Sequence, residues 1–153
     1  MFRSRLVFVS PFFSLMLFTV GCAKKLPVIV PTEGVVTIDG KPLANATVTF
    51  VPQLDRFGDE SNSVAITDEA GRFTLNCNFN NAPGAVEGEH IVLVTESPLP
   101  DKLRASQDGN AVERYRISLG NRPIPPAYSS VSQSPLRVTV KAGQDPIPLA
   151  LSR

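Results

Sequence analysis

Two cysteines and a single histidine are the side chains of this 153-residue chain with the greatest capacity for chemistry. Cys22 follows a long apolar stretch, Cys77 lies in an alternating apolar run, and His90 directly precedes the apolar run 91–94. Nucleophilic catalysis by serine or cysteine usually needs a neighbouring base, and His90 is the only histidine that could supply one. Because it stands at a predicted strand start beside apolar residues, we interpret it as a structural histidine. The sequence therefore predicts that the protein is not an enzyme.

The residues before Cys22 have the order of a secretion signal. Arg3 and Arg5 provide positive charge, residues 6–20 are mostly apolar, and the small residue Gly21 follows. The apolar run is too short and too interrupted to span a bilayer, which takes about 20 apolar residues. We therefore predict that residues 1–21 are a signal peptide.

The end of this segment, Thr19-Val20-Gly21-Cys22, resembles the bacterial lipobox, in which a small residue precedes the cysteine that receives lipid. The resemblance implies that Cys22 is the lipid attachment site and that its partner is membrane lipid. An ordinary signal peptide, or an uncleaved anchor that contains a cysteine, is the alternative. Ala23 occupies the place where Asp signals inner-membrane retention. By analogy with Gram-negative sorting, we expect an outer-membrane protein that faces the periplasm.

Charge and composition exclude several classes of function. Lys and Arg total 15 against 14 for Asp and Glu, so there is no basic footprint for nucleic acid. No zinc motif with paired histidines occurs, and Asp55, Asp59 and Glu60 lack the dense alternation of a calcium loop. We expect Asp68 to cap its own turn, with Gly71 supplying a positive φ. The sequence predicts no metal and no cofactor.

The elements that carry these residues are predicted to be strands, because apolar and polar residues alternate along most of the chain. Turn residues separate the seven predicted strands, which lie near residues 34–38, 46–50, 64–66, 73–79, 91–94, 136–140 and 147–151. This pattern indicates an all-β protein, a seven-stranded transthyretin- or Ig-like β-sandwich over residues 34–153. Residues 22–33, which contain Pro27 and Pro31, are predicted to be a tether. Cys77 shares a strand face with apolar residues, so we interpret it as a buried core residue.

The alternation fails between residues 97 and 134, a polar stretch with prolines at both ends. A run of this length in a small domain should be functional or poorly ordered. Residues 113–119 could form one helical turn or a short edge strand. The stretch around Tyr128 is expected to pack over the sandwich edge in a structural role.

Three motifs resemble those of the carboxypeptidase regulatory-like domains, which share a transthyretin-like sandwich. The first is the opening run 34–50, GVVTIDGKPLANATVTF, and the second is the hairpin 67–75, TDEAGRFTL. The third is Pro83-Gly84 with Gly88-Glu89-His90, although here three residues separate the two parts.

The C-terminal part is similar to the short lipoproteins with this domain that are numerous in Planctomycetes. This similarity is carried by residues 124–128, IPPAY, and by the stretch 134–143. Together the resemblances cover residues 34–95 and 123–153 and leave the middle stretch unmatched.

The lipobox, the seven alternating strands and the lack of a catalytic set of residues predict a non-catalytic, membrane-anchored envelope lipoprotein whose sandwich is an interaction or structural module. A second hypothesis is a glycan- or peptide-binding module that uses residues 97–134, because loops on a rigid sandwich commonly carry recognition. The partner would then be an envelope protein or a glycan. A small-molecule hydrolase is disfavoured, because transthyretin-like hydrolases of 5-hydroxyisourate use several histidines and a C-terminal Tyr-Arg-Gly-Ser. This chain ends in Leu151-Ser152-Arg153.

Overall fold

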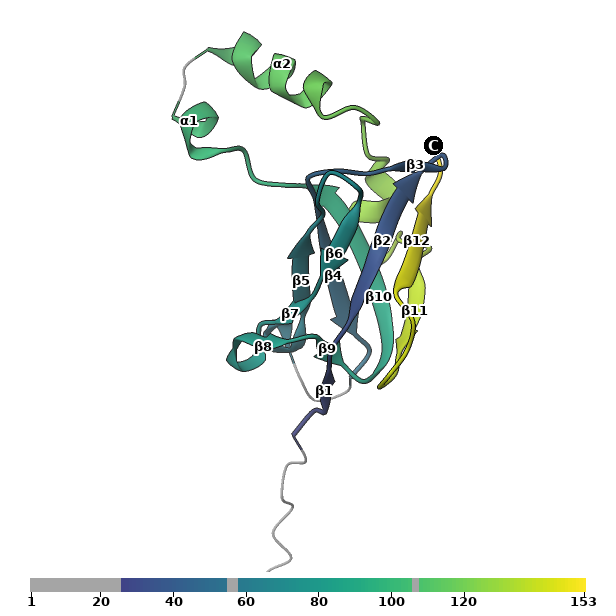
Figure 1. Ribbon diagram of the computed structural model, residues 1–153. Helices are drawn as coiled ribbons and strands as arrows, with labels where there is room; N and C mark the ends of the chain where they lie inside the picture. The colour runs from purple at the N-terminus through teal and green to yellow at the C-terminus, as the bar shows by residue number, and fades with distance from the viewer. Residues whose placement is uncertain (1–25, 55–57, 106–107) are drawn as a thin grey trace, which may run out of the picture.

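Alternating apolar residues build two sheets that face each other (Figure 1). The computed structural model describes residues 26–54, 58–105 and 108–153. In order, the six-stranded sheet contains β11 (Arg137–Val140), β10 (Gly88–Glu96), β4 (Ala46–Pro52), β5 (Ser63–Ile66), β7 (Asn76–Cys77) and β8 (Ala82–Pro83). The four-stranded sheet contains β12 (Ile147–Leu151), β2 (Glu33–Ile38), β3 (Lys41–Pro42) and β6 (Arg72–Thr74). The predicted all-β sandwich is confirmed, with more strands than the seven expected.

The core lies between the sheets because every second residue of each long strand points inward. Val48 and Phe50 of β4 are fully buried, as are Val92 and Val94 of β10. The ring of Phe50 meets the ring of Phe73 from the opposite sheet at a centroid distance of 6.0 Å. Such aromatic pairs contribute about 0.5–1.5 kcal/mol beyond the area that they bury. This contact joins the two sheets near the start of β2 and β5, since Phe73 is paired with Gly34 and Phe50 with Ser63.

The strand predicted at residues 73–79 is divided between the two sheets. β6 pairs with β2 of the four-stranded sheet, whereas β7 pairs with β5 of the six-stranded sheet. Between them the Leu75 N–H donates to the Thr32 carbonyl at 2.9 Å, and the Leu75 carbonyl accepts from Gly84 N at 2.7 Å. The prediction of one continuous strand was therefore wrong, although the alternation of buried side chains runs through the crossing without a break.

The turn before this crossing depends on two residues. The Asp68 carboxylate accepts the N–H groups of Ala70 at 2.9 Å and Arg72 at 2.8 Å. Gly71 has a φ of +74°, and a Cβ there would lie 2.4 Å from the Val36 carbonyl oxygen. The expected roles of Asp68 as a cap and of Gly71 as the positive-φ residue are confirmed.

The domain begins earlier than the sequence suggested. β1 (Ile29–Val30) pairs with β9 (Ala85–Val86) to form a third, two-stranded sheet. Val30 is 6 % exposed, and the buried Thr32 hydroxyl donates to the Val30 carbonyl at 2.9 Å. The tether predicted over residues 22–33 is thus wrong for its last part, which is fixed to the sandwich. Prolines on both sides of a two-residue strand hid it from a search for alternation.

Candidate functional site

β1 and the two helices of the middle stretch, α1 (Asp101–Arg104) and α2 (Gly109–Ser118), lie at opposite ends of the sandwich (Figure 1). β10 connects the two ends. It begins next to β1, where the Glu87 N–H donates to the Val28 carbonyl, and it ends at Glu96 near the helices. Nine residues of strand rise about 30 Å. The predicted signal peptide and Cys22 lie outside the described residues, which begin four positions later at Leu26. Within the part of the chain that the structure describes, no helix is long and apolar enough to cross a membrane.

The middle stretch is more ordered than the sequence indicated. It contains α1 (Asp101–Arg104), α2 (Gly109–Ser118) and the 3₁₀-helix η3 (Pro126–Ser129). The alternatives left open for residues 113–119 are settled in favour of helix, which ends at Ser118. The Asp108 carboxylate caps α2 by accepting the Asn110 N–H at 2.9 Å. We use the name arm for α1 and α2 with their flanking segments, residues 97–105 and 108–121.

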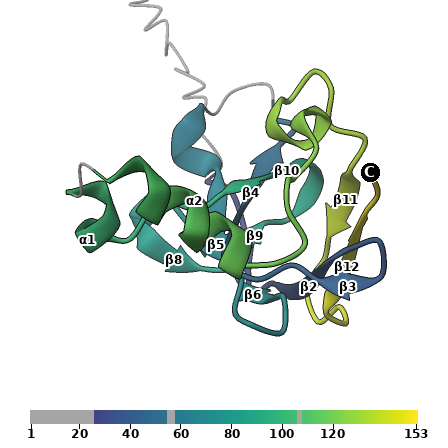
Figure 2. The ribbon, with the colours of Figure 1, turned by 90° about the horizontal axis from the view of Figure 1, so that it is seen from above.

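The arm projects from the sandwich, and none of the described residues of its two helices is buried. Seen from above, α1 and α2 cross over the β5 side of the sandwich, away from β11 and β12 (Figure 2). Helices as short as these gain little stability alone in water, so their position depends on contacts with the sandwich. The residues that supply those contacts are the first candidates for a functional role.

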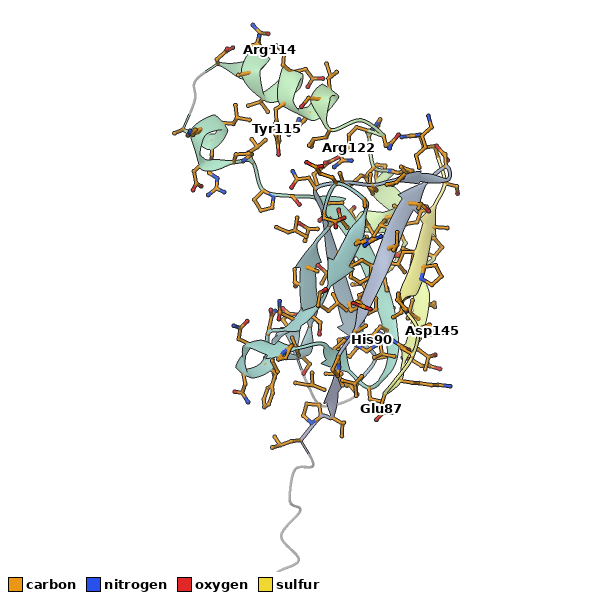
Figure 3. All side chains as sticks on the ribbon, viewed as in Figure 1. Glu87, His90, Arg114, Tyr115, Arg122 and Asp145 are labelled. Atoms are coloured by element: carbon orange, nitrogen blue, oxygen red, sulfur yellow. The ribbon has the colours of Figure 1, made fainter. Side chains whose placement is uncertain are left out.

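Arg122 is the principal contact between the arm and the sandwich (Figure 3). Its side chain is 9 % exposed, and its Nε donates to the Glu96 carboxylate at 2.7 Å. Its Nη2 donates to the carbonyls of Ala44 at 2.8 Å and Asn45 at 3.1 Å, and its Nη1 to Gly120 at 3.3 Å. The planar guanidinium of an arginine presents five donors in a fixed fork, whereas lysine has three donors on a single nitrogen. Arg122 therefore joins the arm, β10 and the β3–β4 connection.

Three further hydrogen bonds hold the arm. The Asn45 amide donates to the Tyr115 hydroxyl at 2.7 Å, and the Asn121 amide donates to the Pro42 carbonyl at 2.8 Å. The hydroxyls of Thr47 and Ser97 lie 3.2 Å apart. The arm is thus held by four contacts, which are made by Ser97, Tyr115, Asn121 and the adjacent Arg122, although its helices bury no residue.

A groove of about 700 Å³ lies where the end of α2 faces the Glu96–Arg122 pair. Its volume is in the range of ligand-binding clefts. Ile117 on its wall is 69 % exposed, and the exposed side chains of Glu113 and Arg116 also line it. Charges of both signs next to isoleucine can bind a ligand, but they provide no nucleophile with its base.

Tyr128 covers an edge of the four-stranded sheet. Its side chain is buried, and its hydroxyl accepts the Ser152 N–H at 3.0 Å and donates to the Ser152 carbonyl at 3.4 Å. The Leu151 carbonyl points to the other side, where it accepts the Asp39 N–H at 3.0 Å. Backbone groups alternate in direction along a strand, so Pro148, three positions before Leu151, points to the free edge of β12. A proline has no N–H, so this part of the edge has no donor to offer another strand. The expectation that the stretch around Tyr128 packs over the sandwich edge is confirmed.

His90 is enclosed in the sandwich and is 1 % exposed (Figure 3). Its ring lies 5.6 Å from that of Phe50, and its Nδ1 is 3.1 Å from the Gly88 carbonyl oxygen. Burial lowers the pKa of His90 below its ordinary value, and the hydrogen bond to Gly88 partly offsets this effect. A neutral ring that donates from Nδ1 fits these contacts, and it leaves a buried Nε2 without a partner. The position favours the structural interpretation over a catalytic one.

Cys77 is also a core residue, as predicted. It is fully buried, and its thiol donates to the Ser61 carbonyl at 3.6 Å. Among residues 26–54, 58–105 and 108–153, no three histidine, cysteine, aspartate or glutamate side chains come together as a metal site. Of the acidic residues considered for calcium, Asp55 lies outside the described residues, and Asp59 accepts the Asn62 amide at 3.4 Å.

Sequence reasoning missed Arg122, because no local pattern marks an arginine that binds carbonyls 77 and 78 residues away. Comparison with protein-family models, with curated proteins and with solved structures found no match for the chain.

Proposed function

We propose that this protein is a non-catalytic lipoprotein of the bacterial cell envelope, held in a membrane by lipid on Cys22. Its β-sandwich then serves as a scaffold that presents the arm as a contact surface. The observation that carries the proposal is the placement of the arm, which Arg122 fixes at the end of the sandwich opposite β1.

The sequence supports the anchor. A charged start, an apolar run and Gly21-Cys22 stand in the order of a lipoprotein signal, and the described domain begins only a few residues later. Two or three acyl chains on one residue bind membranes far more stably than one chain, which binds reversibly. Ala23 favours the outer membrane, facing the periplasm, as the location. The relation to carboxypeptidase regulatory-like domains, carried by the motifs at 34–50 and 67–75, belongs to the same proposal.

The arrangement of the arm supports the contact role. A helix without buried residues is stabilised here by contacts that leave its outer side free. Rigid scaffolds that present such segments commonly use them for recognition. The single histidine, His90, is enclosed in the core, which argues against hydrolytic activity. Turnover by the purified protein that is lost in His90→Ala would be evidence for such activity.

The anchor is tested by cell fractionation. The wild-type protein should fractionate with membranes, and inhibition of the lipoprotein signal peptidase should make the precursor accumulate. Cys22→Ala should release the protein from the membrane fraction, whereas Cys77→Ala serves as the matched control for loss of a thiol. If Cys22→Ala still fractionates with membranes, the lipid anchor is wrong.

The groove favours a second candidate function, the binding of a peptide or glycan. Its described lining contains two glutamates, two arginines and two isoleucines but no aromatic ring, which suits a peptide better than a sugar. Chemical shifts of Ile117 and Ile124 methyl groups should move on addition of peptides with both charged and aliphatic side chains. Arg116→Ala should weaken this response and Lys102→Ala, on α1, should not. A response that is the same in both variants would exclude the groove as the site.

A further inference from the structure

Exposed apolar residues gather at the point where the chain enters the sandwich. Leu26 is 64 % exposed and Val28 is 53 % exposed. Directly after them β1 pairs with β9, so these residues are connected to a fixed element and not to a long free linker. We use the name β1 end for this end of the molecule, formed by Leu26–Val30, β9 and Glu87.

The length of chain before the β1 end limits its distance from a lipidated Cys22. Leu26 lies four positions after Cys22 and Val28 lies six positions after it, so a fully extended chain spans at most about 14 Å and about 22 Å. These distances are comparable with the thickness of the headgroup region plus one layer of side chains. The β1 end therefore cannot move far from the membrane surface.

The charges at this end have both signs, since Lys24 and Lys25 directly precede Leu26 in the sequence. Glu87 and Asp145 both lie there (Figure 3), and Lys141 follows Val140, which is paired with Gly88 at the start of β10. Mixed charge beside two exposed aliphatic side chains fits a neutral lipid interface, in which leucine and valine lose contact with water.

We propose that the β1 end is a lipid-contacting surface, in which Leu26 and Val28 enter the membrane interface and the arm points away from the membrane. This inference rests on the proposed lipidation of Cys22. It adds that the sandwich contacts the membrane with its β1 end in one orientation. The arm then lies about one strand length above the membrane surface. A partner of the arm then meets the protein from the aqueous side.

The orientation is tested with the mature lipoprotein in phosphatidylcholine vesicles that carry a nitroxide on the lipid headgroup. Glu87→Cys and Ile117→Cys provide one labelling site at each end for a small fluorophore. Cys77 is fully buried and does not compete for the label. We expect the nitroxide to quench a label at residue 87 and to leave a label at residue 117 unquenched. Equal quenching at both positions, or none at residue 87, would overturn the inference.

The apolar contact is tested by Leu26→Asp combined with Val28→Asp, which should abolish most of the quenching at residue 87. Ile66→Asp is the matched control, since Ile66 is 55 % exposed and lies on β5 beside Thr47, toward the arm. If the double variant keeps full quenching, or Ile66→Asp loses it equally, the surface is not the one proposed. Circular dichroism checks that each variant is folded.

Lipidation is measured separately by the intact mass of the mature protein. A mass without the diacylglyceryl group means that the proposed function itself has failed. A lipidated protein with quenching that does not depend on position means that only the orientation is wrong.

Discussion

Arg122→Ala should detach the arm from the sandwich and destabilise the whole domain. The substitution removes the guanidinium that serves Glu96, Ala44 and Asn45 together. Breaking a fully buried ion pair costs about 3–5 kcal/mol, because one charge stays behind without a partner. Glu96 is 42 % exposed and remains hydrated, so the cost here should be lower. We expect a loss of about 2 kcal/mol, the range for hydrogen bonds to a charged group.

Urea unfolding of the chain without residues 1–21, carrying Cys22→Ser, measures this loss. With a denaturant dependence of about 2 kcal/mol per molar, the midpoint should fall by about 1 M. Limited proteolysis should show faster cleavage in the arm than in wild type. Arg122→Lys keeps the charge but not the fork, and it should retain only part of the stability.

Arg104→Ala is the matched control. Its side chain is 62 % exposed, and its ion pair with Asp101 at 3.6 Å is largely accessible to solvent. Such pairs contribute about 0–1 kcal/mol, so the midpoint should hardly change. If Arg122→Ala and Arg104→Ala destabilise the protein equally, the arm is not held by Arg122 and the reasoning is refuted.

Three further substitutions test the fold. Tyr128→Phe removes the hydroxyl that serves Ser152, so it should cost about 1 kcal/mol and increase self-association in light scattering, because an uncovered sheet edge pairs with other chains. Gly71→Ala should cost about 2–3 kcal/mol in the same urea assay, because alanine would adopt a positive φ against the Val36 carbonyl; an unchanged midpoint would contradict the described turn. His90 has a pKa below its ordinary 6.5 in the folded state, so the unfolded chain binds more protons and stability should fall as the pH drops below about 6.5. The difference between unfolding free energies at pH 7.5 and 5.5 should shrink in His90→Gln, and a difference that stays the same would assign it to other groups.

The long strands could be predicted because burial leaves a mark on the sequence. Ala46, Val48 and Phe50 alternate with threonines since one face of β4 meets the core and the other does not. The change of sheet at Leu75 left no such mark. Phe73 before the crossing, Leu75 at it and Cys77 after it are all buried, so the alternation continues unchanged. Alternation reports which side of a strand is covered, but not which strand is its neighbour.

The elements around the candidate site were harder to predict for the same reason. α2 buries no residue, so its sequence carries no apolar stripe with helical spacing. The contacts of Arg122 and Asn121 join residues 77 to 79 positions apart, and only the folded chain brings them together. The prediction for Cys22 concerns processing and lies outside the described residues.

The parallel pairing of β12 with β2 has a consequence for the time at which the protein can fold. It joins Ile147 to Gly34, and just beyond it the Arg153 N–H donates to the Asp39 carboxylate across 114 residues of chain. Closing so long a loop is slow, and it cannot begin until the last residues have been synthesised. For a chain exported unfolded, the four-stranded sheet stays incomplete during synthesis and transport. Under the proposed export, this topology delays completion of the four-stranded sheet until β12 has crossed the membrane.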